Sequence, residues 1–555
     1  MTRTYRLSVF LLILTAIVFI RVPFFDFVQL EDPTHLDSHP QFSSSHATNI
    51  FDLWKRPYLI YMPATYSVWN ITGKLNPPQP LDSIPRTQTG VLKKFRFNSF
   101  VFHCLPILFH LANVFVLFWL LCFLTGHPLG SFFGALFFGI HPLQVESVAW
   151  VSGLKETLGG FWGFLAILTF LLGQEMPPRS RGFKFLFLGS TVLFLLSLLS
   201  NPSYVAVPIA AAALMYFLYR KERFFLGARL LSLWLALSAP AIWIGRSTRY
   251  WAHTPETPLH LKDKVVLALD SLSFYFSKIL FPLNLGIDYG RTPDWVLNQT
   301  SVHTTAAVFF IFLFSLTLFL KWNKIQWALA GEAFFIFALL PLFLFNRLLF
   351  QTSSSVADHD LYFPLAGLAL AIAFFLRTFS KKSGVPLVFT LLLITLATRS
   401  YFQTGFWKDT PTLLNHALEI NSESSIAHRN LGYYYEKEED YPQAISHFKS
   451  SVALHPQAQD FSKIANIYLT KRDYQEARTN FERALNLNPL SSTDYHGLGL
   501  SWLGLGNKPL AQENFAKANA LTPRNLSSKN ALRQVTRDLR IETKQANRSR
   551  RKSRH

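Results

Sequence analysis

Two adjacent carboxylates, Glu31 and Asp32, follow the first apolar segment of the chain, residues 7–20. Acids so close together push one pKa upward, which suits a general base that takes a proton from a hydroxyl group. Pro33 follows Asp32, and Asp-Pro sequences favour turns, so a helix cap or turn is the structural alternative. The pair is a candidate catalytic base whose role the spacing alone leaves open.

A second group of polar residues lies at 141–156, in the sequence HPLQVESVAWVSGLKE. His141, Glu146, Trp150 and Lys155 would gather on a short helix at a membrane surface. His141 and Glu146 lack the i, i+4 spacing of a helix-borne metal pair, and no third ligand is apparent, so a divalent metal is not indicated here. An interfacial helix with a purely structural role is the alternative.

The elements that position these residues are apolar. The 555 residues are 50% hydrophobic and 15% charged, whereas soluble proteins carry about a quarter charged residues. Only two cysteines occur, which excludes a disulfide scaffold or a structural zinc protein. Besides residues 7–20, apolar runs long enough to span a bilayer begin near Ser99, Leu129, Thr157, Phe183, Tyr204, Leu226, Thr304, Ile325, Leu361 and Val385. The sequence therefore predicts about eleven membrane spans.

The loops between these runs predict an orientation, because short cytoplasmic loops collect Lys and Arg. With the N-terminus inside, the short outside loops hold only Lys155 and Arg347. Residues 25–98, 144–156, 244–303 and 346–360, and the C-terminal domain, are then extracytoplasmic. Residues 265–282 contain Asp270 and Lys278, which favours an amphipathic interfacial helix over a twelfth span.

A repeat follows Ser400. A pattern of small and large apolar residues recurs at offsets of 33 and 34 positions: Leu431, Gly432, Tyr435, Ala444, Phe448 and Pro456; Ile464, Ala465, Tyr468, Ala477, Phe481 and Pro489; Leu498, Gly499, Trp502, Ala511, Phe515 and Pro523. This pattern is typical of tetratricopeptide helix pairs. Residues 406–419 are expected to form the second helix of an incomplete preceding repeat, and residues 527–541 a capping helix.

The net charge of +20 is unevenly distributed. Residues 524–554 hold 11 Lys and Arg against two acids, and the inside loops hold much of the remaining excess. A basic tail is more often solvated or in contact with lipid than a nucleic-acid site, so no nucleic-acid partner is expected.

Together, Glu31-Asp32, the stretch HPLQVESVAWVSGLKETL, the stretch ADHDLYFP at 357–364 and the terminal repeats resemble the transmembrane and tetratricopeptide repeat-containing proteins. These O-mannosyltransferase-like proteins belong to the GT-C glycosyltransferase superfamily. The resemblance covers essentially the whole chain.

This resemblance implies transfer of a sugar, with mannose as one candidate, from a polyprenyl- or dolichyl-phosphate carrier to a protein hydroxyl or a glycan, with inversion. It makes Glu31 or Asp32 the base. The phosphate leaving group needs cationic or hydrogen-bonding partners. Candidate substrate- and phosphate-binding residues on the outer face are Arg56, His141, Glu146, Lys155, Arg347, Asp358 and His359.

Three cations of the family pattern are absent. Met62 and Asn201 stand where relatives carry Arg and Lys, and His359 replaces an Arg with a titratable group. Glu31 also replaces the usual Asp. A catalytically degenerate membrane scaffold, whose repeats recruit protein partners, is therefore the alternative to an enzyme.

The predicted fold is all-α: a GT-C-like membrane helix bundle at 1–402, tetratricopeptide repeats at 403–526, and a capping helix with a basic tail at 527–555. The expected partners are the lipid-phosphate sugar, its protein or glycan acceptor, membrane lipid, and proteins that bind the repeats. No cofactor beyond that donor is indicated, and the sequence leaves the need for a divalent metal open. The expected location is a bacterial cytoplasmic membrane with periplasmic repeats, or the endoplasmic reticulum with lumenal repeats in a eukaryote.

Overall fold

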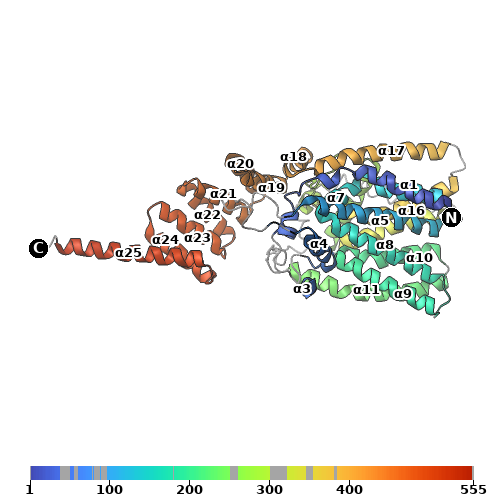
Figure 1. Cartoon of the computed structure of the whole chain (residues 1–555), viewed down its shortest axis with the longest axis horizontal. Coiled ribbons are helices and arrows are strands. Elements are labelled where there is room, and N and C mark those ends of the chain that lie inside the picture. The colour runs from blue at the N-terminus through green and yellow to red at the C-terminus, as the bar shows by residue number, and fades with distance from the viewer. Residues whose placement is uncertain are drawn as a thin grey trace. The chain divides into compact units, whose positions relative to one another are not determined.

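The structure, a computed structural model (Figure 1), describes residues 2–37, 50–55, 60–77, 79, 88, 97–178, 180–219, 221–249, 260–299, 322–344, 354–379 and 384–552. These residues form helices and irregular segments, with no strand among them. The chain divides into two compact units. The membrane unit comprises Met1–Pro80 and Phe95–Ser422, and the repeat unit comprises Leu81–Lys94 and Glu423–His555. The predicted all-helical fold is confirmed.

The membrane unit contains long apolar helices joined by short helical turns. The longer helices are α1 (Thr2–Phe19), α4 (Pro63–Leu75), α5 (Ser99–Thr125), α6 (Pro128–Ile140), α8 (Leu154–Gln174), α9 (Arg181–Ser200), α10 (Ala206–Leu218), α11 (Lys221–Arg249), α12 (Leu261–Leu280), α15 (Trp322–Leu344), α16 (Leu365–Phe379), α17 (Gly384–Thr404) and α18 (Thr410–Ile420). The shorter elements are η1 (Val22–Phe24), η2 (Pro33–Asp37), α3 (Ile50–Lys55), η4 (Pro142–Gln144), α7 (Val145–Ala149), η5 (Val151–Gly153), η6 (Pro202–Val205), α13 (Pro293–Asn298), η7 (Asp358–Leu361) and η8 (Gly405–Trp407).

Helix α5 illustrates how the sequence sets the ends of these helices. The Asn98 side chain accepts a hydrogen bond from the Phe100 N–H and so caps the first turn. The helix stops at Gly126, whose φ of +63° is the left-handed conformation that glycine adopts without strain. Its 27 residues rise about 40 Å, more than the hydrocarbon thickness of a bilayer.

Six helical segments among the described residues are long and apolar enough to cross a membrane, or seven if the bent pair Pro128–Ile140 and Pro142–Ala149 is one span. Three further apolar helices, Pro202–Leu218, Gln326–Pro341 and Leu365–Phe379, are shorter. The run expected from Thr304 lies outside the described residues, so the number eleven stays a prediction. Helix α12 is not among the candidate spans, in line with the amphipathic helix expected at 265–282.

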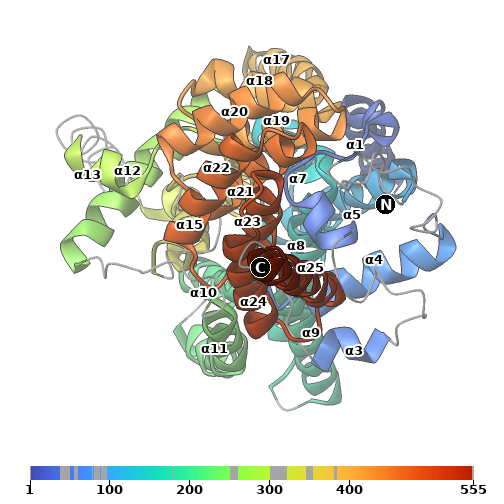
Figure 2. The ribbon, with the colours of Figure 1, turned by 90° about the vertical axis from the view of Figure 1, so that its left-hand side faces the viewer.

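The apolar helices pack along one another in the membrane unit (Figure 1). Helix α5 contacts α6 and α8, α8 contacts α9, and α16 contacts both α6 and α15. In the view turned by 90°, α11 and α17 are seen close to end-on (Figure 2). The turns η4 to η5 and η7 lie at the ends of these helices, where the polar residues singled out in the sequence gather.

The repeat unit contains three helix pairs and a final helix. They are α19 (Ser425–Lys437) with α20 (Tyr441–Leu454), α21 (Ala458–Thr470) with α22 (Tyr474–Leu487), α23 (Ser492–Gly504) with α24 (Lys508–Leu521), and α25 (Leu526–Lys552). The small residue of each first helix faces the Phe of its second. A Cβ on Gly432 would lie 2.7 Å from the Phe448 ring, and one on Gly499 would lie 2.6 Å from the Phe515 ring. The spacing of small and large residues thus sets how closely the paired helices approach.

The turn within each pair also recurs. Asp440, Asp473 and Asn507 each cap the second helix with a side-chain oxygen. The residue just before each cap has positive φ: 61° at Glu439, 60° at Arg472 and 81° at Gly506. Three unrelated residue types adopt the same turn because the cap and the helix packing fix it.

The boundary between the units falls after Ser422, rather than after residue 402 as composition suggests. Helix α18, expected to be part of an incomplete repeat, lies in the membrane unit. Its His416 stacks on Phe406 and hydrogen-bonds the Leu285 carbonyl at 3.0 Å. The expected capping helix and basic tail form one continuous helix, α25, as far as Lys552.

Candidate active site

Asp32 anchors the segment after the first span to the start of α8. Its side chain is fully buried, and Oδ1 accepts hydrogen bonds from the Ser152 hydroxyl at 2.6 Å and the Ser152 N–H at 3.2 Å. Oδ2 accepts from the Val28 N–H at 3.2 Å. Because the N–H groups at the start of a helix lack intrahelical partners, a carboxylate is well placed there. Asp32 therefore ties the loop to the helix that carries Lys155.

Glu31 faces that lysine. Its Oε2 lies 2.9 Å from Lys155 Nζ and 3.4 Å from His35 Nε2, and its side chain is 12% exposed. His35 is in turn 3.0 Å from the Tyr66 hydroxyl through Nδ1. Lys155 lies 5.1 Å from the centre of the Trp150 ring. The acid pair and the second polar segment, 124 positions apart in sequence, thus form one cluster.

The two acids differ in electrostatics. Burial alone would raise the pKa of Glu31, but the Lys155 charge and the hydrogen bonds from His35 and Lys155 outweigh burial and lower it to about 2. Burial also dominates at Asp32, and with the neighbouring Glu31 charge it raises the pKa to about 7, although hydrogen bonds from Ser152 and Val28 oppose the rise. Glu31 is therefore ionised at any physiological pH, whereas Asp32 titrates near neutrality.

The turns at 141–153 hold Lys155 and Trp150 in place. The bent helix pair α6 and α7 turns by 51° around His141, whose Nδ1 accepts from the Leu143 N–H at 3.3 Å. The other ring nitrogen, Nε2, lies 3.2 Å from the Ile279 carbonyl. Both nitrogens of this fully buried ring are thus bonded to backbone groups. His141 therefore supports the turn and has no ring nitrogen left for a phosphate.

Gly153 makes the tightest contact of these turns. A Cβ at this position would lie 2.4 Å from the Ser147 carbonyl oxygen, closer than any side chain can approach. A glycine is required here because two backbone segments touch. The contact fixes the start of α8 relative to α7.

His359 joins the cluster from the opposite segment, at 357–364. Its Nδ1 lies 2.8 Å from Glu146 Oε1, and its backbone N–H donates to Glu146 Oε2 at 3.3 Å. Burial would lower the pKa of His359, but the charge and hydrogen bond of Glu146 raise it to about 10, so the ring is a cation at neutral pH. The His359 and Trp150 ring centres lie 6.5 Å apart, so Trp150 neighbours both cations.

Two tyrosines hold the carboxylates on either side of His359. The Tyr289 hydroxyl donates to Asp358 Oδ1 at 2.6 Å, and the Tyr275 hydroxyl donates to Asp360 Oδ2 at 2.8 Å. Burial and the Glu146 charge raise the pKa of Asp358 to about 8. Asp358 is therefore held within the protein, 4% exposed, and supports the segment that presents His359.

Met62 and Asn201, which stand where the family pattern has cations, do not provide a phosphate ligand in the cluster. Met62 is 1% exposed in an apolar group with Tyr66 and Trp69. Asn201 donates to Glu156 Oε1 at 3.3 Å. Arg56 and Arg347, the remaining candidates, lie outside the described residues.

Sequence reasoning gave no role to His35 or Ser152. His35 stands four residues after Glu31, a spacing that brings two side chains together on one helical turn, so this contact was detectable. Ser152 gave no signal, because its partner Asp32 lies 120 positions away.

The cluster combines a carboxylate that can take a proton from a hydroxyl group with two cations that can bind an anion. An ionised, partly exposed Glu31 can accept the proton of an attacking hydroxyl, while Lys155 and His359 can balance negative charge on a leaving group. The described residues contain no group of three or more His, Cys, Asp or Glu arranged to hold a metal ion.

Comparison with known proteins agrees with both parts of the chain. A family model for the tetratricopeptide repeat matches residues 458–491, which are α21 and α22. The protein O-mannosyl-transferase TMTC3 of Mus musculus is 22% identical over 442 residues, covering 71% of this chain and 47% of that protein. The protein O-mannosyl-transferase F38B6.6 of Caenorhabditis elegans is 22% identical over 312 residues, covering 54% of this chain and 42% of that protein.

Among solved structures, the Arabidopsis OM64 TPR domain aligns with a TM-score of 0.20 and 20% identity, over 20% of this chain and 94% of that domain. The chain spans about half the length of the curated relatives it matches. This membrane protein is a homologue of proteins named protein O-mannosyl-transferase and carries tetratricopeptide repeats.

Proposed function

We propose that the chain is a multi-pass membrane glycosyltransferase of GT-C type. It transfers a sugar, with mannose as the first candidate, from a polyprenyl- or dolichyl-phosphate carrier to a protein hydroxyl or a glycan. The observation that carries the proposal is the cluster of Glu31, Lys155 and His359, assembled from three distant segments. The names of the relatives favour the same chemistry.

In this mechanism Glu31 is the base and Asp32 a positioning residue. The acceptor oxygen attacks the anomeric carbon while Glu31 takes its proton. The bond between that carbon and the phosphate oxygen breaks, and its electron pair leaves with the lipid phosphate, so the configuration inverts. Glu31 is chosen on access and not on basicity: its side chain is 12% exposed, whereas Asp32, which has the raised pKa, is fully buried by Ser152 and Val28.

Lys155 and His359 stabilise the phosphate as its charge grows. Each is held by a carboxylate in the structure, Lys155 by Glu31 and His359 by Glu146. When Glu31 takes up the acceptor proton, the Lys155 charge loses its partner at the moment when the leaving phosphate gains charge. The ion pair thus couples proton removal to stabilisation of the leaving group.

The distribution of Lys and Arg supports a reaction on the extracytoplasmic face. We propose a bacterial cytoplasmic membrane with periplasmic repeats as its location. The repeats then hold the protein acceptor, or partners that deliver it, near the membrane.

The test is transfer of a labelled sugar from a polyprenyl-phosphate donor by the purified full chain. Glu31→Gln keeps the size of the side chain but removes the base, so the rate should fall about 10²- to 10⁴-fold. Glu436→Gln is the matched control, because Glu436 is also a buried glutamate paired with a lysine, at 2.9 Å, but in the repeat unit. Wild-type transfer by Glu31→Gln rules out Glu31 as the base.

A membrane-anchored scaffold is the second candidate. The observation in its favour is that Met62 and Asn201 contribute no charge to the cluster and that Glu146 and Glu31 balance its two cations. This function predicts no transfer from any lipid-phosphate sugar, together with protein partners whose retention survives Glu31→Gln and Lys155→Met. Transfer that depends on Glu31 excludes it.

A further inference from the structure

Helix α25 ends the described chain as a 27-residue amphipathic helix. One side packs on the last repeat: Val535 is 2% exposed and shares an apolar cluster with Phe515, Leu532 and Leu539. This contact fixes which side of the helix faces outward. The outward side therefore has a defined chemistry.

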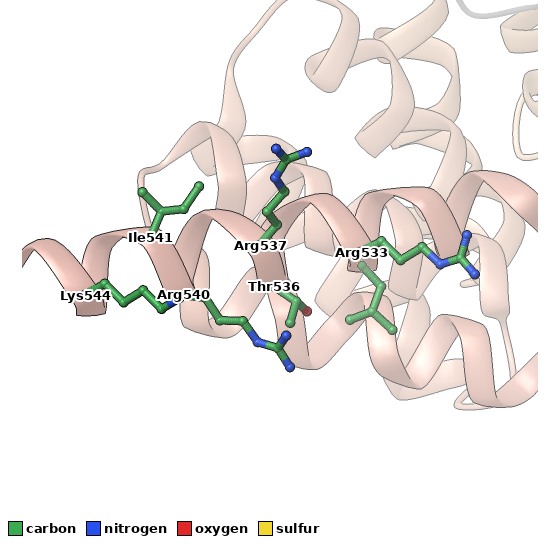
Figure 3. Close-up of a pocket in the computed structure, with 7 residues that line it drawn as sticks. Arg533, Thr536, Arg537, Arg540, Ile541 and Lys544 are labelled. Carbon is green, nitrogen blue, oxygen red and sulfur yellow. The ribbon is translucent and has the colours of Figure 1, made fainter.

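That side carries a row of cations, named here the α25 stripe. Arg533, Arg537, Arg540, Lys544 and Arg548 follow one another at intervals of three or four residues, and all five are exposed. Figure 3 shows the first four side chains projecting from the helix beside Thr536 and Ile541. Together with Leu532, these residues line an open hollow of about 670 Å³. At 1.5 Å per residue the stripe is about 22 Å long.

No carboxylate of the helix balances this charge. The positions three and four residues before and after each stripe residue, where helical ion pairs form, hold no Asp or Glu. The two acids of the helix, Asp538 and Glu542, lie off this face, and Glu542 pairs with Lys508 of α24. Favourable interaction with the helix dipole is limited to the last turn, so it does not account for cations in the middle of the helix.

The shape and setting of the stripe favour a lipid surface as its partner. The stripe is straight, four of its five residues are Arg, and Arg binds phosphate with two parallel hydrogen bonds. The stripe belongs to a chain whose other unit carries candidate membrane spans, so a lipid surface is present at a high effective concentration. The helix contains no aromatic residue that would insert between lipids.

We propose that the α25 stripe binds the phosphate headgroups of an anionic bilayer surface. The attraction is electrostatic and reversible, and it holds the repeat unit against the membrane in which the chain is embedded. It is independent of the sugar-transfer proposal, because it uses no residue of the Glu31 cluster.

The test uses the full chain in nanodiscs, with Cys104 and Cys122 replaced by Ser and a donor fluorophore attached through Asn547→Cys. Asn547 is exposed on α25 between Lys544 and Arg548. Energy transfer to headgroup-labelled lipid should rise roughly twofold when about a third of a neutral lipid is replaced by phosphatidylglycerol at low salt. Raising the salt to about 0.5 M should abolish the rise, since the Debye length falls below 5 Å.

Two triple variants with equal loss of charge make the test specific. Arg537→Gln with Arg540→Gln and Lys544→Gln should lose the rise. Lys449→Gln with Lys471→Gln and Arg483→Gln, which removes three exposed cations from the repeats, should keep it. An equal loss in both variants would mean that net charge, and not the stripe, attracts the lipid.

A third arm compares an acidic peptide with lipid. An oligoglutamate peptide is added to the labelled chain in neutral nanodiscs, and its binding is read from fluorescence anisotropy. Stripe-dependent binding of the peptide, without any response to phosphatidylglycerol, overturns the lipid proposal in favour of an acidic protein partner. A response to phosphatidylglycerol that only the stripe variant loses supports the proposal.

Discussion

The membrane unit and the repeat unit both bury charged side chains, but they assemble them differently. In the membrane unit, the pair Glu31–Lys155 joins residues 124 positions apart, and His359–Glu146 joins residues 213 apart. In the repeat unit, Arg429–Asp460 and Lys463–Glu436 join residues 31 and 27 apart, about one repeat. The charges gathered from distant segments form the candidate site, whereas the charges that link adjacent repeats hold those repeats together.

The largest expected effect comes from removing the lysine of one buried ion pair in each unit. Lys155→Met and Lys463→Met each remove the cation of a lysine–glutamate pair with a separation of 2.9 Å. Each should destabilise its own unit by about 3–5 kcal/mol, because a buried carboxylate loses its lysine partner. The value for Lys463 should lie at the lower end, since this side chain is 25% exposed.

Hydrogen exchange of the full chain, read separately for the two units, measures both costs. Only Lys155→Met should lose sugar transfer, by at least about 10²-fold, because only Lys155 faces a leaving phosphate. Equal transfer by the two variants would remove the functional distinction between the pairs.

A second, smaller effect tests the packing of the repeats. Gly432→Ala should destabilise the α19–α20 pair by about 1–3 kcal/mol, because the new Cβ meets the Phe448 ring at 2.7 Å. Helix propensity alone predicts the opposite sign, since Ala stabilises helices relative to Gly. The control is Ala465→Gly at the equivalent position of the next repeat, which should cost about 1 kcal/mol. Slower exchange in α19 of Gly432→Ala would show that close packing does not decide this position.

The third effect is a pH dependence confined to the membrane unit. Transfer should rise by up to about tenfold between pH 6 and pH 8, because only ionised Asp32, with a pKa of about 7, accepts all three hydrogen bonds from Ser152 and Val28 that set the position of Glu31. Glu31, with a pKa of about 2, stays ionised over this range and adds no pH dependence. The rate profile of Asp32→Asn should be flat between pH 6 and pH 8, and a retained slope would assign the titration to another group.

Raising the pH should lower the stability contributed by Asp32 while it raises the rate of transfer. The pKa of Asp32 in the folded protein lies above its ordinary value of 3.8, so folding disfavours the ionised form. Its contribution to stability is complete below about pH 4 and is lost as the pH rises through about 7. Transfer and local stability should therefore change in opposite directions, which hydrogen exchange at 29–35 would detect.

The smallest effect concerns the recurring turn of the repeats. Asp473→Ala removes the oxygen that accepts from the Glu476 N–H at 3.3 Å, and should cost about 1 kcal/mol at the start of α22. Gln475→Ala, an exposed change in the same helix, should leave exchange there unchanged. Equal protection in the two variants would show that packing alone maintains the turn.

The sequence separation of the contacts, short in the repeat unit and long in the membrane unit, also explains how far the sequence predicts the structure. The Gly432–Phe448 contact recurs at a fixed spacing, so its geometry was predictable. The pairing of Glu31 with Lys155 was not, because it depends on how α8 packs beside the loop after α1. The sequence predicts a full span from Tyr204, but helix α10 begins at Ala206 and ends at Leu218. Hydropathy detected the apolar run without locating those ends.

The contact of Gly153 with the Ser147 carbonyl limits how this site can evolve. Any larger residue at 153 would separate α7 from α8, moving Trp150 and Lys155 together. The segment that joins α7 to α8 therefore cannot lengthen or shift without displacing Trp150 and Lys155. Variation in specificity is expected at side chains that can change without moving this turn.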